Sequence, residues 1–291
     1  MMQNTEHTAA PLLVRGGRVH DAVHPEPQQI DLLLENGRIV AMGHELNVPA
    51  DIAVLDAAGL DIFPGFVDAH THIGLDGYGI GYEGCDYNEM NDIWTPQLRA
   101  IDGINPRDPS FAHAREAGIT CVCTGPGSAN VLGGTFTAIR IAKEFDVDLT
   151  LEHVTEGHLI VDELAKESNI PMAVGPSLTF ASKFELQNKS WETPGVLAKA
   201  GCHVSIITDN SVIPQQYLPL CAGMAVKAGM DPFAALQAIT INPARHIGIA
   251  DRVGSIEVGK DADLVLTDGC PFEVMTNVKA VLINGAVVSQ K

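Results

Sequence analysis

Gly65-Phe-Val-Asp-Ala-His70-Thr-His72 is the stretch that decides the fold. Its apolar residues predict a strand, and the polar residues at its end lie where barrel enzymes place their catalytic groups. Alternate side chains of a strand share a face, so His70 and His72 are expected to project together. Imidazole nitrogens suit zinc, nickel and iron(II). The pair therefore predicts half of a metal site, with a chance pair of surface histidines as the alternative.

The middle of the chain alternates short apolar runs, rich in β-branched residues, with helical stretches. Repeated strand–helix units of this kind predict a parallel sheet, and polar groups at the strand ends favour a (β/α) barrel. The expected strands are Ile62 to Ala69, Ile119 to Thr124, Leu149 to His153, Met172 to Gly175 and Val204 to Asp209. The expected helices are Arg107 to Ala117, Ala138 to Phe145, Ile160 to Ser168, Pro194 to Ala200 and Gln216 to Ala228, with another beginning at Asp231-Pro232.

Both ends of the chain are rich in short strands and turns. Glu35-Asn36-Gly37-Arg38 predicts a hairpin, because Asn-Gly between two apolar runs favours a tight turn. Neither end is long enough to bury a core by itself. We therefore expect one small β-sandwich built from residues 1–60 and 249–291, with residues 61–248 forming the barrel between them.

Composition excludes several classes of protein. The 291 residues are 46% hydrophobic and 19% charged, which excludes a disordered chain. A net charge of −18 disfavours binding to nucleic acid or to anionic membrane surfaces. No basic start precedes an apolar run and no segment is long enough to span a membrane, so we expect neither an export signal nor a membrane anchor. With six scattered cysteines expected to be reduced, these features predict a cytoplasmic location.

Two further strand ends carry candidate residues. The run Ser205-Ile-Ile-Thr-Asp209 places a carboxylate where it can bind a metal and take a proton from activated water, although a turn or helix-capping Asp is the common alternative. His153 closes another strand and is a plausible third nitrogen ligand. His158 lies five positions later, where substrate contact or solvation is expected. Glu152 should face away from His153, toward the surrounding helices.

These residues belong to a resemblance that covers about residues 12–288. The chain resembles the metal-dependent amidohydrolase superfamily, close to its imidazolonepropionase-like and dihydroorotase-like branches. The matching motifs are PGFVDAHTH at 64–72, LEHVTEGH at 151–158 and IITD at 206–209. The run AITINPARHIGIADRVGSIEVGKDADLVL at 238–266 is the most specific, although its own role is structural.

The resemblance implies a distorted TIM-like barrel with a divalent metal at its C-terminal rim. It makes His70 and His72 the first-strand ligands, His153 the sixth-strand ligand, and Asp209 both an eighth-strand ligand and the general base. His158 and Asn210 are secondary candidates for substrate contact. One or two ions are expected, with zinc first and nickel, manganese or iron as alternatives. The implied activity is hydrolysis of a non-peptide C–N bond in a cyclic amide, urea, amidine or acyl-amino acid.

The chain departs from this pattern in the length of its barrel. A complete barrel takes about 250 residues and eight strands, whereas residues 61–248 supply five recognisable strands. We infer that the third to fifth strands are missing near residues 137–145, together with the residues that bridge two metals in many relatives. The first and eighth strands are expected to stay neighbours, since both lie outside the gap.

Three interpretations of this departure stay open: an internally deleted version of a normal enzyme, a natural shortened relative that dimerises to complete a barrel, and an inactive assembly or binding subunit. A cyclic-nucleobase deaminase is a further alternative function, because it shares the His-x-His and Asp. A small-molecule substrate and a homo-oligomer are expected.

Overall fold

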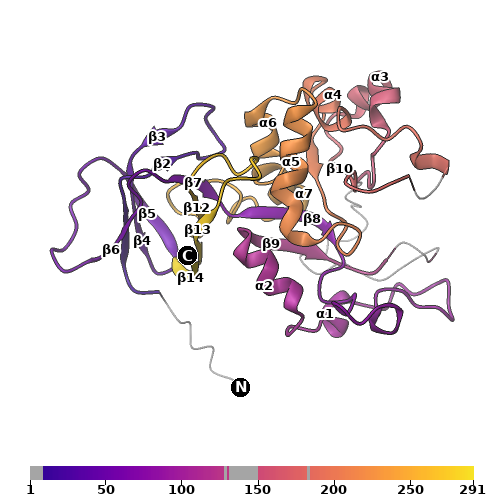
Figure 1. The fold of residues 1–291 in the computed structure, drawn as a ribbon, viewed down its shortest axis with the longest axis horizontal. Coiled ribbons are helices and arrows are strands. Elements are labelled where there is room, and N and C mark those ends of the chain that lie inside the picture. The colour runs from indigo at the N-terminus through magenta and orange to yellow at the C-terminus, as the bar shows by residue number, and fades with distance from the viewer. Residues whose placement is uncertain (1–8, 128–129, 131–149, 182–183) are drawn as a thin grey trace.

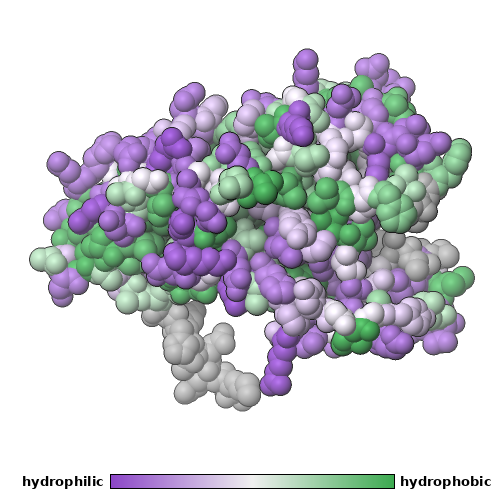
Figure 2. All heavy atoms as spheres, viewed as in Figure 1, coloured by the Kyte–Doolittle hydropathy of each residue, from purple (hydrophilic) through white to green (hydrophobic). Residues whose placement is uncertain are grey.

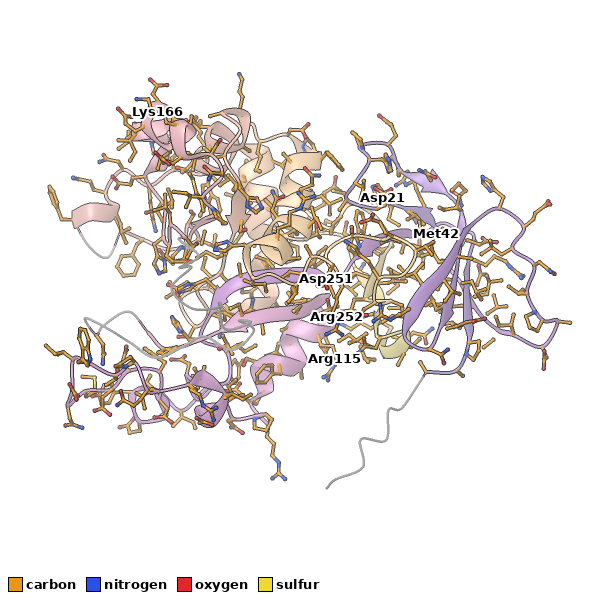
Figure 3. The ribbon with its side chains drawn as sticks, turned by 180° about the vertical axis from the view of Figure 1, so that it is seen from behind. Asp21, Met42, Arg115, Lys166, Asp251 and Arg252 are labelled. Atoms are coloured by element: carbon orange, nitrogen blue, oxygen red, sulfur yellow. The ribbon has the colours of Figure 1, made fainter. Side chains whose placement is uncertain are left out.

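The computed structural model describes residues 9–127, 130, 150–181 and 184–291. Figure 1 shows the strands of the two chain ends gathered on one side and the helices on the other. Seen from behind in Figure 3, Met42 lies among the strands of one side and Lys166 on the side of the helices. No helix in the described ranges has the length and apolar character needed to cross a membrane.

A four-stranded sheet comes from the N-terminal residues alone. Its strands are β5 (Arg38–Gly43), β4 (Asp31–Glu35), β1 (Leu12–Arg15) and β6 (Ala53–Asp56), in that order. The predicted Asn-Gly hairpin is confirmed, since β4 and β5 pair antiparallel up to Glu35 and Arg38. Asn36 and Gly37 both have positive φ, 51° and 78°, as the tight turn requires.

A six-stranded sheet combines residues from both ends of the chain. Its order is β14 (Ala286–Gln290), β13 (Val278–Ile283), β12 (Leu264–Thr267), β7 (Asp61–Pro64), β2 (Arg18–Val19) and β3 (Gln28–Gln29). β12 joins the two ends directly by pairing antiparallel with β7. One hydrophobic cluster contains buried side chains of both sheets, such as Leu32 and Leu264. The exact division at residues 60 and 249 stays a prediction.

The strand predicted from Ile62 to Ala69 is in fact two strands, so that prediction was wrong. β7 belongs to the six-stranded sheet, whereas β8 (Phe66–Thr71) pairs in parallel with β9 (Ile119–Thr124). The chain changes partners at Gly65, whose amide donates to the Asp263 carbonyl while the Phe66 amide donates to Gly118. A Cβ on Gly65 would overlap the side chain of Thr120, so only glycine fits this crossing.

The second parallel pair consists of β10 (Met172–Val174) and β11 (Val204–Ile206), and Leu151 adds a parallel bridge to Met172. The backbone of residues 238–239 connects the two pairs, because Ala238 accepts from the Ile206 amide and Ile239 from the Val67 amide. The His72 amide then donates directly to the Asn210 carbonyl at 2.6 Å. The segments that contain β8 and β11 are therefore neighbours, as expected for the first and last strands.

Helices cover these strands and supply most of the larger core. They are α1 (Ala100–Gly103), α2 (Pro109–Glu116), α3 (Val161–Leu164), α4 (Thr193–Lys199), α5 (Leu218–Lys227), α6 (Pro232–Gln237) and α7 (Ile241–His246). Short 3₁₀ turns occupy Tyr82–Gly84, Gly157–Ile160, Ala165–Glu167, Phe184–Leu186 and Gln215–Tyr217. The predicted start at Asp231-Pro232 is confirmed, since the Asp231 carboxylate accepts from the Ala234 amide. The expected helix at 138–145 and the expected shortening at 137–145 lie outside the described residues.

Candidate metal centre

The end of β8 places two imidazoles side by side. His70 is in the strand and His72 follows it, and their ring centroids are 5.4 Å apart at an interplanar angle of 84°. The side chains are only 9% and 11% exposed. His72 Nδ1 lies 2.7 Å from the Gly125 carbonyl oxygen, so Nδ1 carries the proton and donates it there. The lone pair of Nε2 then faces the interior of the site.

Asp209 lies beside both rings. It comes three residues after β11, and its Oδ1 is 3.2 Å from His72 Nε2 and 3.6 Å from His70 Nε2. The side chain is 12% exposed. The apolar strand therefore ends with a carboxylate at the same rim as the two histidines, although 137 positions separate His72 from Asp209 in the sequence.

His153 approaches from the other side of the site. Its ring centroid is 4.8 Å from that of His70, and its Nδ1 lies 3.9 Å from Asp209 Oδ2 and 3.3 Å from the Gly175 carbonyl oxygen. Burial lowers the pKa of His153, and the nearby Asp209 opposes that shift. A neutral imidazole is the form that binds a metal ion.

The distances among these groups fit a small divalent cation. Single donor atoms of His70, His153 and Asp209 all lie within 4.8 Å of one another. A tetrahedral zinc ion with bonds of about 2.0–2.1 Å holds its donors about 3.3 Å apart. The contacts of Asp209 with His72 and His70, at 3.2 and 3.6 Å, are close to that spacing. His72 is not one of these three residues and adjoins the set through its contact with Asp209. Imidazole nitrogens with a carboxylate oxygen suit zinc and neighbouring transition metals.

A buried carboxylate that the sequence reading did not single out connects the two sides of the site. Asp68 is fully buried on β8, and its Oδ2 accepts from Thr208 Oγ1 at 2.5 Å and from Gln215 Nε2 at 2.6 Å. Its Oδ1 accepts from the His70 amide. Thr208 precedes Asp209, so Asp68 fixes the candidate ligands of both segments. Burial raises the pKa of Asp68 to about 6 despite these hydrogen bonds.

Glu152 was expected to face away from His153, toward the surrounding helices, and the structure agrees with the second part for one of its two carboxylate oxygens. One carboxylate oxygen, Oε1, does face helix α7, where His246 Nε2 is 3.6 Å away. The other, Oε2, lies 3.0 Å from His70 Nδ1. Burial would raise the pKa of Glu152, but the interactions with His246 and His70 outweigh it and hold the pKa well below its ordinary value. Strand alternation does not predict the direction of Glu152, because Leu151 forms an isolated bridge and the backbone after it is irregular.

The two secondary candidates have partners within the protein. His158 is in the 3₁₀ turn Gly157–Ile160, and its Nδ1 lies 2.7 Å from Thr193 Oγ1 at the start of α4. The Asn210 side-chain oxygen accepts from the Gln215 amide at 3.1 Å. The substrate roles of His158 and Asn210 stay predictions.

A long loop after β8 lies next to the histidines. Tyr87 stacks on His72 with centroids 5.2 Å apart, and burial, followed by Cys85, raises its pKa to about 12. Tyr87 and Asn88 line a cavity of about 270 Å³ together with Pro126 and Gly127. The loop also exposes large apolar side chains, and Figure 2 shows hydrophobic atoms on this part of the surface. They include Tyr78, Ile80, Tyr82, Met90, Ile93 and Trp94.

The comparisons with known proteins agree with this geometry. The model of the Amidohydrolase family matches residues 132–288. The chain belongs to the amidohydrolase family. The crystal structure of an amidohydrolase from Thermotoga maritima MSB8 has a TM-score of 0.89 and 30% identity, over 96% of this chain and 100% of that one. The predicted membership of the metal-dependent amidohydrolase superfamily is thus confirmed, and the fold is that of its TIM-like barrels.

Curated relatives of this amidohydrolase match shorter stretches. An amidohydrolase of Hapsidospora irregularis is 36% identical over 115 residues, which are 38% of this chain and 12% of that protein. A dihydroorotase of Syntrophus aciditrophicus is 46% identical over 68 residues, which are 23% of this chain and 16% of that protein. The chain thus spans well under two thirds of the length of these relatives.

Proposed function

We propose that this protein is a metal-dependent hydrolase that cleaves a non-peptide C–N bond. The observation that carries the proposal is the cluster of His70, His72, His153 and Asp209 at the ends of neighbouring strands, in a chain of the amidohydrolase family. The family is generally metal-dependent, and the donor set fits one small divalent ion, with zinc as the first candidate. Nickel, manganese, iron and a second ion stay alternatives.

The protein's own residues would then divide the work. A divalent ion held by these side chains would supply a Lewis acid that polarises a carbonyl and activates water. Asp209 Oδ1 faces the histidines at 3.2 Å and 3.6 Å. Asp209 Oδ2 is 3.9 Å from His153 Nδ1, beyond hydrogen-bonding distance from it, so Oδ2 can accept the proton of the attacking water. The proton would then pass to the leaving nitrogen as the C–N bond breaks. An amide would give a carboxylate and an amine, and a urea would give a carbamate and an amine.

We propose a cyclic amide or urea as the substrate class, with amidines and acyl-amino acids as alternatives. The support comes from the names of the relatives. Besides the dihydroorotases, a protein named dihydropyrimidinase from Arabidopsis thaliana is 34% identical over 92 residues. The burial of His70, His72 and Asp209 favours a small molecule over a polymer.

A second candidate function is deamination of a nucleobase. It is favoured by an adenine deaminase of Methanosphaera stadtmanae that is 43% identical over 75 residues. The same Asp209 and histidines could act on a C–NH₂ group, so release of ammonia without ring opening distinguishes this reaction. An inactive assembly subunit predicts neither reaction.

We further propose that the barrel is short of its third to fifth strands and that the protein is a cytoplasmic homo-oligomer. The support is that, outside the four- and six-stranded sheets, the parallel strands of the described residues are β8, β9, β10 and β11 with the bridge at Leu151, too few to close an eight-stranded circle. Open edges of such a sheet favour pairing with another copy. Sedimentation of the purified protein tests the oligomer directly.

The decisive experiment is elemental analysis of the purified protein without added metal, followed by assays on cyclic amides, cyclic ureas and aminated heterocycles. We expect one tightly held divalent ion per chain and ring opening that Asp209→Asn abolishes. A folded protein without metal, whose activity is unchanged in His72→Ala, would refute the proposal. A metal-bearing protein that releases only ammonia would favour the deaminase.

A further inference from the structure

His70 in β8 and His72 just after it have different acceptors at their Nδ1 atoms. His72 Nδ1 lies 2.7 Å from a neutral carbonyl oxygen, that of Gly125. His70 Nδ1 lies 3.0 Å from a carboxylate oxygen of Glu152. A carboxylate that accepts the proton of an imidazole makes the opposite nitrogen a stronger ligand and fixes the direction of the ring. A neutral carbonyl also fixes the direction of the ring, but it strengthens the opposite nitrogen as a ligand less than a carboxylate does.

We propose that Glu152 is a positioning residue, which selects the Nδ1–H tautomer of His70 and holds its Nε2 toward Asp209. The proposal rests on the metal centre of the proposed function and adds a residue to it. His70 Nε2 is 3.6 Å from Asp209 Oδ1, on the side of the ring opposite to Glu152. Loss of Glu152 removes the charged acceptor of the Nδ1 proton, so the Nε2–H tautomer of His70 becomes populated beside the Nδ1–H tautomer. The Nε2–H tautomer cannot bind a metal through Nε2.

Glu152 is itself held in place by groups from three segments. Thr150 Oγ1 donates to Glu152 Oε1 at 3.1 Å and lies 2.5 Å from His246 Nε2. His246 is at the end of α7, is 6% exposed, and has its other ring nitrogen 3.3 Å from Ser205 Oγ on β11. The Nε2–H of His246 can therefore donate to Thr150, whose hydroxyl donates to Glu152.

This arrangement orients Glu152 even though its side chain is 32% exposed. An isolated exposed carboxylate would lose much of its effect to solvent and side-chain freedom. Here Oε1 is occupied by the Thr150 hydroxyl and faces His246, so Oε2 is directed at His70. The geometry thus connects helix α7 to His70 through three side-chain contacts, from His246 to Thr150, from Thr150 to Glu152 and from Glu152 to His70.

The test compares Glu152→Gln and Glu152→Leu with the wild type and with Glu163→Gln, a matched change at an exposed position on α3. The first measurement is zinc affinity by competition with a chelator. Glu152→Leu should lower the affinity roughly 10–100-fold, the effect typical of lost outer partners of metal ligands. Glu152→Gln should lower it less, because the amide oxygen can still accept from His70 Nδ1. Glu163→Gln should bind as the wild type does.

The second measurement needs no metal. Nitrogen-15 NMR of the histidine rings in the metal-free protein reports which nitrogen of His70 carries the proton. We expect the Nδ1–H form in the wild type and Glu152→Gln, and a substantial Nε2–H population in Glu152→Leu. An unchanged His70 tautomer in folded Glu152→Leu would overturn the proposal. If the wild type binds neither zinc nor nickel, manganese or iron, the proposed function fails while the tautomer still tests Glu152. If Glu152→Leu does not fold, Glu152→Gln must show the weaker zinc binding.

Discussion

Replacing Asp68 by Asn removes a fully buried carboxylate whose pKa burial raises from 3.8 to about 6. A carboxyl group with a raised pKa binds its proton more tightly in the folded state than in the unfolded chain. Its contribution to stability is therefore fully present below the unfolded pKa of 3.8 and is lost as the pH rises through about 6. When Asp68 is protonated, the Thr208 hydroxyl can accept instead of donate, so the buried pair stays satisfied.

The rise from 3.8 to about 6 corresponds to about 3 kcal/mol, at about 1.4 kcal/mol for each tenfold change in proton affinity. Between pH 4.5 and 7.5 about 2 kcal/mol of this is lost, since part of the titration lies below that range. The side-chain amide of the Asp68→Asn variant does not titrate. The free energy of unfolding of the wild type minus that of Asp68→Asn should therefore fall by about 2 kcal/mol across this range.

The assay is urea unfolding of both proteins at several pH values, in the presence of a chelator so that no metal contributes. Asp162→Asn, an exposed change on α3, is the control and should give a difference from the wild type that stays nearly constant. The reasoning would be refuted if the free energy of unfolding of the wild type minus that of Asp68→Asn stayed constant or rose between pH 4.5 and 7.5. The hydrogen bonds from Thr208 and Gln215 would then have a larger effect on the pKa of Asp68 than its burial.

Three further changes test other parts of the structure. Gly65→Ala would make a Cβ overlap the Thr120 side chain and should lower the free energy of unfolding by about 2–3 kcal/mol, measured by urea unfolding. Asp108→Ala removes the acceptor for the Ser110 and Tyr78 amides and should cost about 1–2 kcal/mol in the same assay. His72→Ala should lower the metal content of the purified protein below that of the wild type by elemental analysis, with little change in its circular dichroism spectrum.

The sequence was most informative where local rules act alone. Asn36-Gly37 predicts a hairpin from two residues, and Asp231-Pro232 predicts a helix start, because turn and cap preferences depend on immediate neighbours. Ile119 to Thr124 is a strand with the predicted bounds. In each case the physical cause lies within a few residues of the effect, so distant parts of the chain do not alter it.

The sequence was least informative where a segment changes partners. Pro64-Gly65 interrupts one apolar run, but only the approach of Thr120 shows why the run becomes two strands in two sheets. The same holds for Asp68 and Glu152. A carboxylate inside or beside a strand gives no sign of its acceptor role until Gln215 and His246 are brought to it from far along the chain.

Two of the four candidate ligands have an unusual backbone conformation. His153 and Asp209 both have left-handed φ angles, 56° and 53°, which non-glycine residues adopt rarely and Asp more readily than most. Such residues persist when neighbouring contacts fix them, and they gather at functional sites. The contacts are present here, since the His153 carbonyl accepts from Thr155 at 2.7 Å and the Asp209 carbonyl from Val212 at 2.8 Å. A glycine would meet the backbone demand at lower cost but would bring no donor atom, so side chains at these two positions favour a role for the imidazole and the carboxylate themselves.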